Sequence, residues 1–178
     1  GNRENALPAI AGILLIYAMF NVAYWYNFIP PVPLSLREIG IYHSVSKTID
    51  GNYSLVYEPN RWYPLANGPS SVFNSQGPAE PIYIFSSIFA PTKLTVPVFY
   101  TWSYYDPTDK VWVMTDRLTF PLKGGREEGY RGYTLKSSIF PARWRVDVET
   151  DRGERIGRVS FKVIDTSEPV KGLVTEVR

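Results

Sequence analysis

The residues that could do chemistry in this chain of 178 residues are few. His43 is the single histidine and cysteine is absent, so a hydrolytic triad would have to use His43, and thiolate chemistry is excluded. A lone histidine is more often a structural hydrogen-bonding residue than a base or a metal ligand. The sequence also has no glycine-rich phosphate loop, paired-cysteine zinc site or His-Glu-x-x-His motif. We therefore expect no enzymatic activity and no cofactor.

Carboxylates occur in two patterns, and neither favours catalysis. Asp147 and Glu149 share a strand face with Arg143 and Arg145, which favours a cross-strand charge ladder on a solvated face over an acid/base pair. The second set is Asp106, Asp109 and Asp116. These aspartates could bind Ca²⁺ in a loop, but their spacing matches no known ligand pattern. We expect no metal site.

Two groups of side chains are candidates for recognition instead. The first, at and after a Gly-Gly turn, is Arg126, Tyr130 and Arg131. It could present two planar cations beside an aromatic ring to a carboxylate, a phosphate or a sugar acid, unless Arg131 pairs with a neighbouring glutamate and Tyr130 packs inside. The second group, which flanks an Asp-Pro turn, is Tyr104, Tyr105 and Trp112. Its rings could stack on a glycan or cap the end of the fold.

The charge balance excludes one class of partner. Lys and Arg number 19 against 17 Asp and Glu, a formal net charge of +2. A nucleic-acid-binding domain needs a basic footprint for its phosphate contacts, so we expect no nucleic-acid partner. With 44% hydrophobic and 15% aromatic residues, the chain can bury a substantial core.

Period-two alternation predicts the strands that must position these side chains. Residues 143–149 and 158–163 alternate apolar with polar or charged side chains on the two sides of an Asp-Arg-Gly turn, which predicts a hairpin. Further alternating or apolar runs occur at 39–45, 53–57, 81–91, 96–102, 111–122 and 133–139. Several short strands joined by turns, with no second helix, predict a mainly β fold: an immunoglobulin-like antiparallel β-sandwich.

The N-terminal segment predicts one transmembrane α-helix before the sandwich. Residues 6–29 are an uncharged, largely apolar run, long enough as a helix to cross a ~30 Å hydrocarbon layer. A secretory signal peptide and a buried helix of a soluble protein are the alternatives. The aromatic residues predicted to lie at the membrane interface are Tyr24, Trp25, Tyr26 and Phe28. A face that could pack on another helix consists of Ala11, Gly12, Ala18 and Asn21.

These elements divide the chain into consecutive parts. They are an N-terminal tail (1–5), the transmembrane helix (6–29), a proline-rich linker (30–37), membrane-proximal strands with a long loop (38–80), the sandwich body (81–166) and a C-terminal tail (167–178). Long loops inside compact domains are often functional or contact a partner. The loop over 58–80 is therefore of interest beyond its role as a connection.

Three stretches carry a resemblance to a known family. They are IFAPTKLTVPVFYTWSYYD, GGREEGYRGYTLK and WRVDVETDRGERIGRVSFKV, all within residues 81–164. In these stretches the chain resembles a bacterial family known as domain of unknown function twenty-nine fourteen. The resemblance implies a β-rich domain attached to bacterial membrane proteins, often after several spanning helices, and it implies no activity.

The sequence leads to one expectation for function and one alternative. The expectation is a non-catalytic structural or accessory subunit of a larger bacterial membrane complex, an energy-transducing assembly being one case. Its helix would contact the lipid bilayer and other membrane-protein subunits. The alternative is a membrane-anchored module that binds cell-envelope glycan through the aromatic and arginine residues. By analogy with other anchored sandwiches, we expect the inner membrane, with the sandwich on the periplasmic side.

Overall fold

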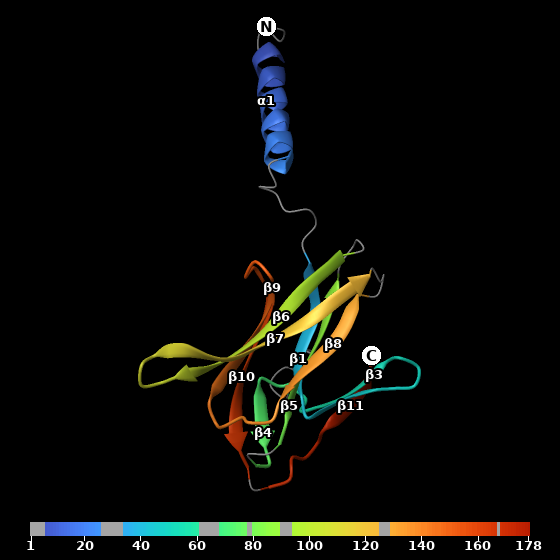
Figure 1. Ribbon diagram of the computed structural model, residues 1–178, viewed down its shortest axis with the longest axis vertical. Helices are drawn as coiled ribbons and strands as arrows, with labels where there is room; N and C mark the ends of the chain where they lie inside the picture. The colour runs from blue at the N-terminus through green and yellow to red at the C-terminus, as the bar shows by residue number, and fades with distance from the viewer. Residues whose placement is uncertain are drawn as a thin grey trace. The chain divides into compact units, whose positions relative to one another are not determined.

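A computed structural model describes residues 6–25, 34–60, 68–77, 80–89, 94–124, 129–166 and 168–178 of the chain. The chain divides into two compact units, Gly1–Pro33 and Leu34–Arg178. The first unit contains a helix and the second contains the strands (Figure 1). Three residues singled out in the sequence lie outside the described ranges: Tyr26, Phe28 and Arg126.

The helix α1 (Ala6–Trp25) is apolar on every side. The consecutive residues from Ile13 to Ile16 are each more than half exposed, and a turn of about 3.6 residues sends four consecutive side chains in all directions. Within the part of the chain that the structure describes, no helix has the length and apolarity needed to cross a bilayer. The prediction of a transmembrane helix over 6–29 is therefore not supported.

Of the predicted contact residues of α1, Tyr24 has a side chain that lies outside the described part of the structure, and the others are exposed. Trp25 is 87% exposed, and Ala11, Gly12 and Ala18 are also exposed. The Asn21 side chain donates a hydrogen bond from Nδ2 to the Tyr17 carbonyl oxygen at 2.7 Å, so part of its polarity is satisfied within the helix. The assignment of these residues to an interface stays a prediction.

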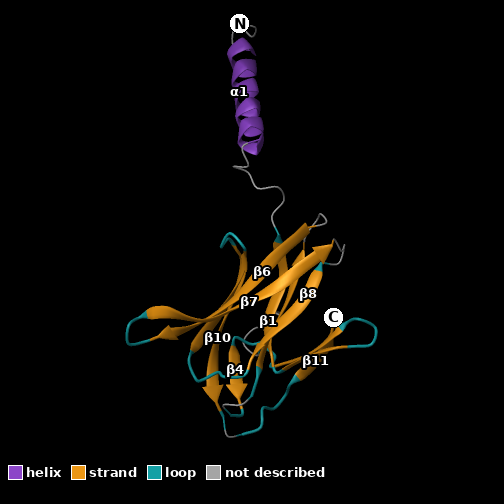
Figure 2. Ribbon diagram, viewed as in Figure 1, coloured by secondary structure: helices purple, strands orange, loops and turns teal. Residues whose placement is uncertain are grey.

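The described residues of the second unit form three sheets, whose strands appear in Figures 1 and 2. The first sheet, in spatial order, is β1 (Ser35–Tyr42), β5 (Ile82–Phe89) and β8 (Tyr130–Lys136). The second is β4 (Val72–Ser75), β10 (Arg155–Asp165), β9 (Arg143–Thr150), β6 (Leu94–Asp106) and β7 (Val111–Gly124). The third is β11 (Val174–Val177), β3 (Tyr53–Tyr57) and β2 (Ser44–Lys47). Among the described strands, all pairings are antiparallel except that of β4 with β10, which is parallel.

The first two sheets share one core, which makes them a β-sandwich. Ile84 and Ile88 of β5 pack in the same buried cluster as Trp102 of β6 and Trp144 of β9, and all four are fully buried. The strand order can be compared with that of an immunoglobulin-like domain. The three-stranded sheet β1-β5-β8 corresponds to strands A, B and E. In the five-stranded sheet, β6 corresponds to strand C, β7 to C′, β9 to F and β10 to G. Trp102 then occupies the strand C position at which such domains bury a tryptophan. The predicted mainly β sandwich is confirmed.

The third sheet extends this plan with a smaller core. Tyr42 and Phe85 of the first sheet pack with Val45, Leu55 and Tyr57 from β2 and β3. The strand β11 pairs with β3 along its whole length, so the segment 167–178, predicted as a tail, contains a strand. A four-residue strand with little alternation gives too weak a pattern to be recognised in the sequence.

The turn before β8 depends on Gly129. Its φ is +84°, and a Cβ at this position would lie 2.8 Å from the Ile88 carbonyl oxygen. We expect Gly129→Ala to lower the free energy of unfolding by about 2–3 kcal/mol, because it adds a steric clash to an unfavourable backbone conformation. Urea unfolding followed by tryptophan fluorescence measures the loss.

The matched control for this prediction is Gly153→Ala. Gly153 has a similar φ of +81°, but a Cβ there would meet no atom within 4 Å. We expect a loss of about 1–2 kcal/mol from the backbone conformation alone. Equal losses in the two variants would show that the contact with Ile88 has no effect.

Candidate functional site

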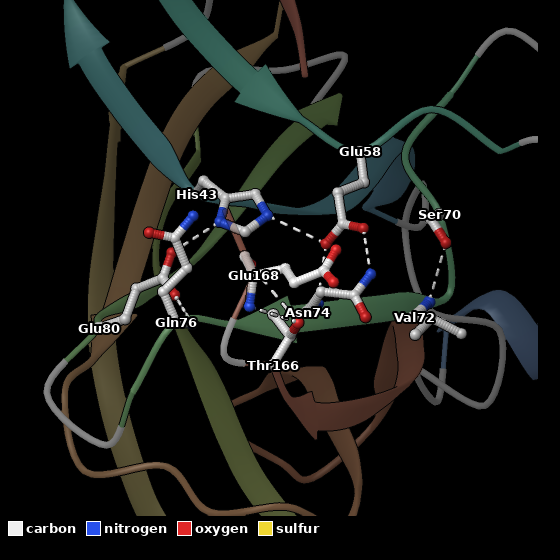
Figure 3. Close-up of polar contacts among 9 residues, drawn as sticks. All are labelled: His43, Glu58, Ser70, Val72, Asn74, Gln76, Glu80, Thr166 and Glu168. Carbon is white, nitrogen blue, oxygen red and sulfur yellow. Dashed lines mark hydrogen bonds and ion pairs between the residues drawn. The ribbon is translucent and has the colours of Figure 1, made fainter. Parts of the chain in front are cut away.

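His43 is held between two carboxylates at the end of β1 (Figure 3). Its Nδ1 lies 2.7 Å from Glu80 Oε1, and its Nε2 lies 3.0 Å from Glu58 Oε1. The ring also stacks on Phe73 of β4, with centroids 4.2 Å apart and planes 22° apart. The cluster of His43, Glu58 and Glu80 is called the histidine clasp below. It joins the residue between β1 and β2, the residue after β3 and the residue two positions before β5.

Backbone and amide groups support both carboxylates of the histidine clasp. Glu58 accepts hydrogen bonds from the backbone N–H of Asn74, at 2.8 Å, and from the Asn74 side-chain amide. Glu80 Oε2 accepts a hydrogen bond from the Gln76 backbone N–H at 2.6 Å. Both supporting residues lie at or just after the end of β4 (Figure 3). The clasp therefore fixes β4 against the β1–β2 connection.

The electrostatics of the histidine clasp favour an imidazolium. Burial alone would lower the pKa of His43, but the hydrogen bonds with Glu58 and Glu80 outweigh it and raise the pKa above its ordinary value. Burial alone would raise the pKa of Glu58, but the hydrogen bonds from His43 and Asn74 lower it overall. When protonated, His43 donates from both ring nitrogens to the two carboxylates. These contacts fit the structural role that the sequence favours for His43, and that role stays a prediction.

A polar pocket of about 510 Å³ adjoins the histidine clasp. Its lining residues include Glu58 and Asn74, together with Thr166, Glu168 and Lys171 from the segment after β10. The Thr166 hydroxyl accepts a hydrogen bond from the Glu168 backbone N–H at 3.2 Å. Within the described ranges, no group of His, Asp and Glu side chains has the arrangement needed to hold a metal ion.

The outer face of the five-stranded sheet carries the predicted charge ladder. Arg158 donates two hydrogen bonds to Asp147, from Nε at 2.6 Å and from Nη2 at 2.9 Å. Arg145 Nε lies 3.5 Å from Asp147 Oδ2, and Arg155 Nη1 lies 4.0 Å from Oδ1. The hydrogen bonds with Asp147 raise the pKa of Arg158, whereas burial, followed by repulsion from Arg158, lowers that of Arg145.

The ladder differs from the sequence prediction in one respect. Asp147 was expected on a solvated face, but it is only 3% exposed. The arginine side chains that pair with it account for this burial, because long stems cover the surface beneath their charged ends. Glu149, at the next position of the same face, is partly exposed and accepts a hydrogen bond from Thr101 Oγ1 at 3.0 Å.

Two of the predicted recognition rings lie together at one end of this face. Tyr105 and Trp112 pair across β6 and β7, with ring centroids 5.4 Å apart. The guanidinium carbon of Arg143 lies 5.4 Å from the Tyr105 ring centroid, and that of Arg145 lies 4.3 Å from the Trp112 centroid. Guanidinium groups in such positions are attracted to the electron-rich ring faces. Aromatic rings and guanidinium groups therefore lie next to each other at this end of the outer face.

Tyr104, the third residue of that group, packs differently. Its ring lies 5.0 Å from that of Phe140 and 5.6 Å from that of Trp144, centroid to centroid. Tyr104 and Tyr105 nevertheless both line a groove of about 540 Å³ at this end of the sandwich. The other residues that line it are Pro107, Phe140, Pro141, Ala142, Arg143, Lys162, Val163, Ile164 and Asp165. We call this feature the end groove.

The first predicted recognition group is not assembled as one site among the described residues. Tyr130 is 8% exposed and packs in the main core, which matches the alternative that it lies inside. Arg131 lines a separate pocket with Arg37, Glu38 and Arg178. The third member, Arg126, lies outside the described ranges.

Sequence reasoning missed the partners of His43 and the cations of the end groove. Glu58 and Glu80 lie 15 and 37 residues from His43 in the chain, and no local pattern links residues that far apart. Arg143 and Lys162 were recognised only as polar positions of two neighbouring strands. Their pairing across the hairpin could not be derived from its turn alone, because a register shift between Arg155 and Gly157 moves the pairing by one residue.

The fold and these sites define a class: an immunoglobulin-like β-sandwich with a histidine clasp on one side and a basic, aromatic outer face. Residues 96–163 match the model of a family described as "Protein of unknown function (DUF2914)". The resemblance to that family is thereby confirmed over this segment. No curated protein matches the chain at a significant level.

Two similar solved structures come from Pseudomonas species. One is an immunoglobulin-like protein from Pseudomonas aeruginosa, with 10% identity and a TM-score of 0.41 over 76% of this chain and 99% of that chain. The other is the Pseudomonas fluorescens alkylpurine DNA glycosylase AlkC bound to DNA containing an abasic site analog. Its identity is 22% and its TM-score 0.37, over 53% of this chain and 27% of that one. Both TM-scores are too low to support an inference about this chain.

Proposed function

We propose that this chain is a non-catalytic accessory subunit of a larger bacterial membrane complex, in which α1 is the attachment element and the sandwich contacts neighbouring subunits. The observation that carries the proposal is the surface of α1, whose apolar side chains are exposed on every side. A helix that is apolar all round is normally covered by protein or lipid. The helix α1 therefore needs a covering surface, and we assign this surface to the membrane complex.

The size of this apolar surface supports attachment over incidental exposure. Transfer of one large aliphatic or aromatic side chain out of water is worth roughly 1.5–3 kcal/mol. The side chains of α1 that are more than half exposed include Ile10, Ile13, Leu14, Leu15, Ile16, Met19, Phe20 and Val22. Burial of these side chains against a partner or lipid would contribute a free energy on the order of 10 kcal/mol, before the cost of association is subtracted. The small residues Ala11, Gly12 and Ala18 would allow a partner helix to approach closely.

The membrane assignment rests on the implication of the family and on the α1 surface. We place the complex in the inner membrane and the sandwich on its periplasmic side, which is an assignment by analogy with anchored sandwiches. Protease protection on spheroplasts tests the side: cleavage of the sandwich from outside supports it, and protection in intact spheroplasts overturns it.

Extraction in a mild detergent followed by native mass measurement tests the subunit assignment. We expect the wild-type chain to co-purify with other protein at a fixed ratio. The double variant Leu14→Lys with Phe20→Lys should lose these partners, because two charges on α1 cannot be buried in an apolar interface without a large penalty. The control, Leu14→Ile with Phe20→Leu, keeps the apolar surface and should retain the partners. A wild-type chain that emerges alone would contradict the proposal.

A second candidate function is an anchored module that binds cell-envelope glycan. The observation that favours it is the end groove, where Tyr104, Tyr105 and Phe140 offer aromatic rings beside exposed cations. Its volume of about 540 Å³ lies in the range of small-ligand sites. A chain that emerges from the mild extraction as a monomer carrying envelope polysaccharide would support this function in place of the first.

A further inference from the structure

The end groove combines an apolar wall with cations from two paired strands. Tyr104 and Tyr105 come from the end of β6, and Phe140, which is 46% exposed, comes from the segment before β9. Arg143 of β9 and Lys162 of β10 are both exposed and also line the groove. The groove is therefore amphipathic, with flat ring surfaces beside hydrogen-bond donors.

Arg143 and Lys162 are directly opposite each other in the β9–β10 ladder. Like charges at opposite positions of an antiparallel pair are unfavourable. Further along the same ladder, Asp147 binds Arg158 and lies near Arg145 and Arg155, so each of those cations has a carboxylate oxygen within 4.0 Å. Among the described residues, no ion pair joins Arg143 or Lys162 to a carboxylate. A bound anion would relieve the repulsion between them.

The acidic residue at the groove does not cancel this charge. Asp165 lines the groove, and with Arg143 and Lys162 it leaves a formal charge of +1 there. Asp165 pairs in register with Ser75 at the far end of β10, three positions beyond Lys162. A ligand with one negative charge would balance the groove.

The packing of Arg143 prepares it for such a ligand. Its guanidinium carbon lies 5.4 Å from the centroid of the Tyr105 ring. A guanidinium group carries its N–H donors in its own plane, in a fork that matches the two oxygens of a carboxylate. Contact with the Tyr105 ring restricts the Arg143 side chain, so this side chain would lose less conformational entropy when a ligand binds.

We propose that the end groove binds an acidic sugar of a glycan, with the sugar carboxylate between Arg143 and Lys162 and the apolar face of the sugar ring against Tyr105 and Phe140. This inference rests on the second candidate function and specifies its ligand class. A uronic-acid unit matches both features of the groove, because its pyranose ring has a C–H face and its carboxylate lies at the ring edge. A neutral sugar would leave the repulsion between the two cations in place.

The test compares two ligands that differ in their carboxyl groups, which are ionised in one and methyl-esterified in the other. Tetragalacturonate and its fully methyl-esterified form are titrated into the full chain in detergent, and binding is measured by calorimetry. We expect the acid to bind at least about tenfold more tightly than the ester, and its affinity to fall with added salt. Arg143→Gln with Lys162→Gln should reduce acid binding to the level of the ester. The control, Lys47→Gln with Arg152→Gln, removes two exposed cations elsewhere and should bind like the wild type.

The possible results separate the inference from the function on which it rests. Equal binding of acid and ester overturns the selectivity for acidic sugars and leaves glycan binding in place. Binding of neither ligand overturns both. Binding of tetraglutamate as tight as that of tetragalacturonate overturns the assignment to a sugar. Because the ligand comparison is made on the wild-type chain, a variant that fails to fold does not prevent a result, and circular dichroism identifies such a variant.

Discussion

Asp147→Ala is expected to lower the free energy of unfolding by about 2–3 kcal/mol. This is less than the loss for a fully buried ion pair, because the Arg158 side chain is 34% exposed and solvent screens part of the interaction. Asp147 is 3% exposed and accepts two hydrogen bonds from Arg158, with Arg145 nearby. Without the carboxylate, these guanidinium groups repel each other on a partly buried face. Urea unfolding of the full chain, followed by tryptophan fluorescence, measures the difference.

Two control variants make the Asp147 prediction specific. Glu149→Ala removes a carboxylate two positions along the same strand, where it is partly exposed and its one hydrogen bond comes from Thr101. We expect a loss of about 1 kcal/mol or less. Asp147→Asn keeps the size of the side chain and some of its acceptors, so its loss should lie between the other two. An Asp147→Ala loss no larger than that of Glu149→Ala would show that burial of Asp147 does not matter.

The sandwich itself could be predicted because its strands alternate strongly. Trp144, Val146 and Val148 lie on one face and are all buried, as their alternation with charged residues indicated. Alternation identifies which side chains share a face, but it does not show what covers that face. The position of Asp147 was therefore predicted correctly and its burial was not. The same limit applies to Gly129, whose contact with Ile88 depends on the pairing of β5 with β8.

The candidate sites were harder to predict than the fold. His43 could be interpreted as structural from its being the single histidine, but its partners come from the end of β3 and from the start of the segment that leads into β5. These segments meet only when β2 pairs with β3 and β1 pairs with β5, and the second of these pairings joins strands far apart in the chain. The end groove likewise requires three strand ends to meet. Sites of this kind follow from topology, which a single sequence specifies weakly.

The second large effect concerns His43 and pH. His43→Ala is expected to lower the free energy of unfolding by about 2–3 kcal/mol at pH 6, because two charge-assisted hydrogen bonds and the stacking on Phe73 are lost. The side chains of His43, Glu58 and Glu80 are 9%, 14% and 22% exposed, so solvent screens the cluster only in part. The folded state raises the pKa of His43, so its contribution is complete below the ordinary value of 6.5 and is lost as the pH rises through the raised pKa.

At acidic pH, the stability contributed by Glu58 changes with pH in the opposite direction to that contributed by His43. The folded state lowers the pKa of Glu58, so its contribution is complete above the ordinary value of 4.5 and is lost as the pH falls through the lowered pKa. The histidine clasp is therefore most stabilising between the two ordinary values, 4.5 and 6.5. Urea unfolding at pH 5.5, 7 and 9 should show wild-type stability decreasing with pH relative to His43→Gln, whose amide can hydrogen bond but does not titrate. Parallel profiles for these two proteins would mean that the proton on His43 does not stabilise the fold.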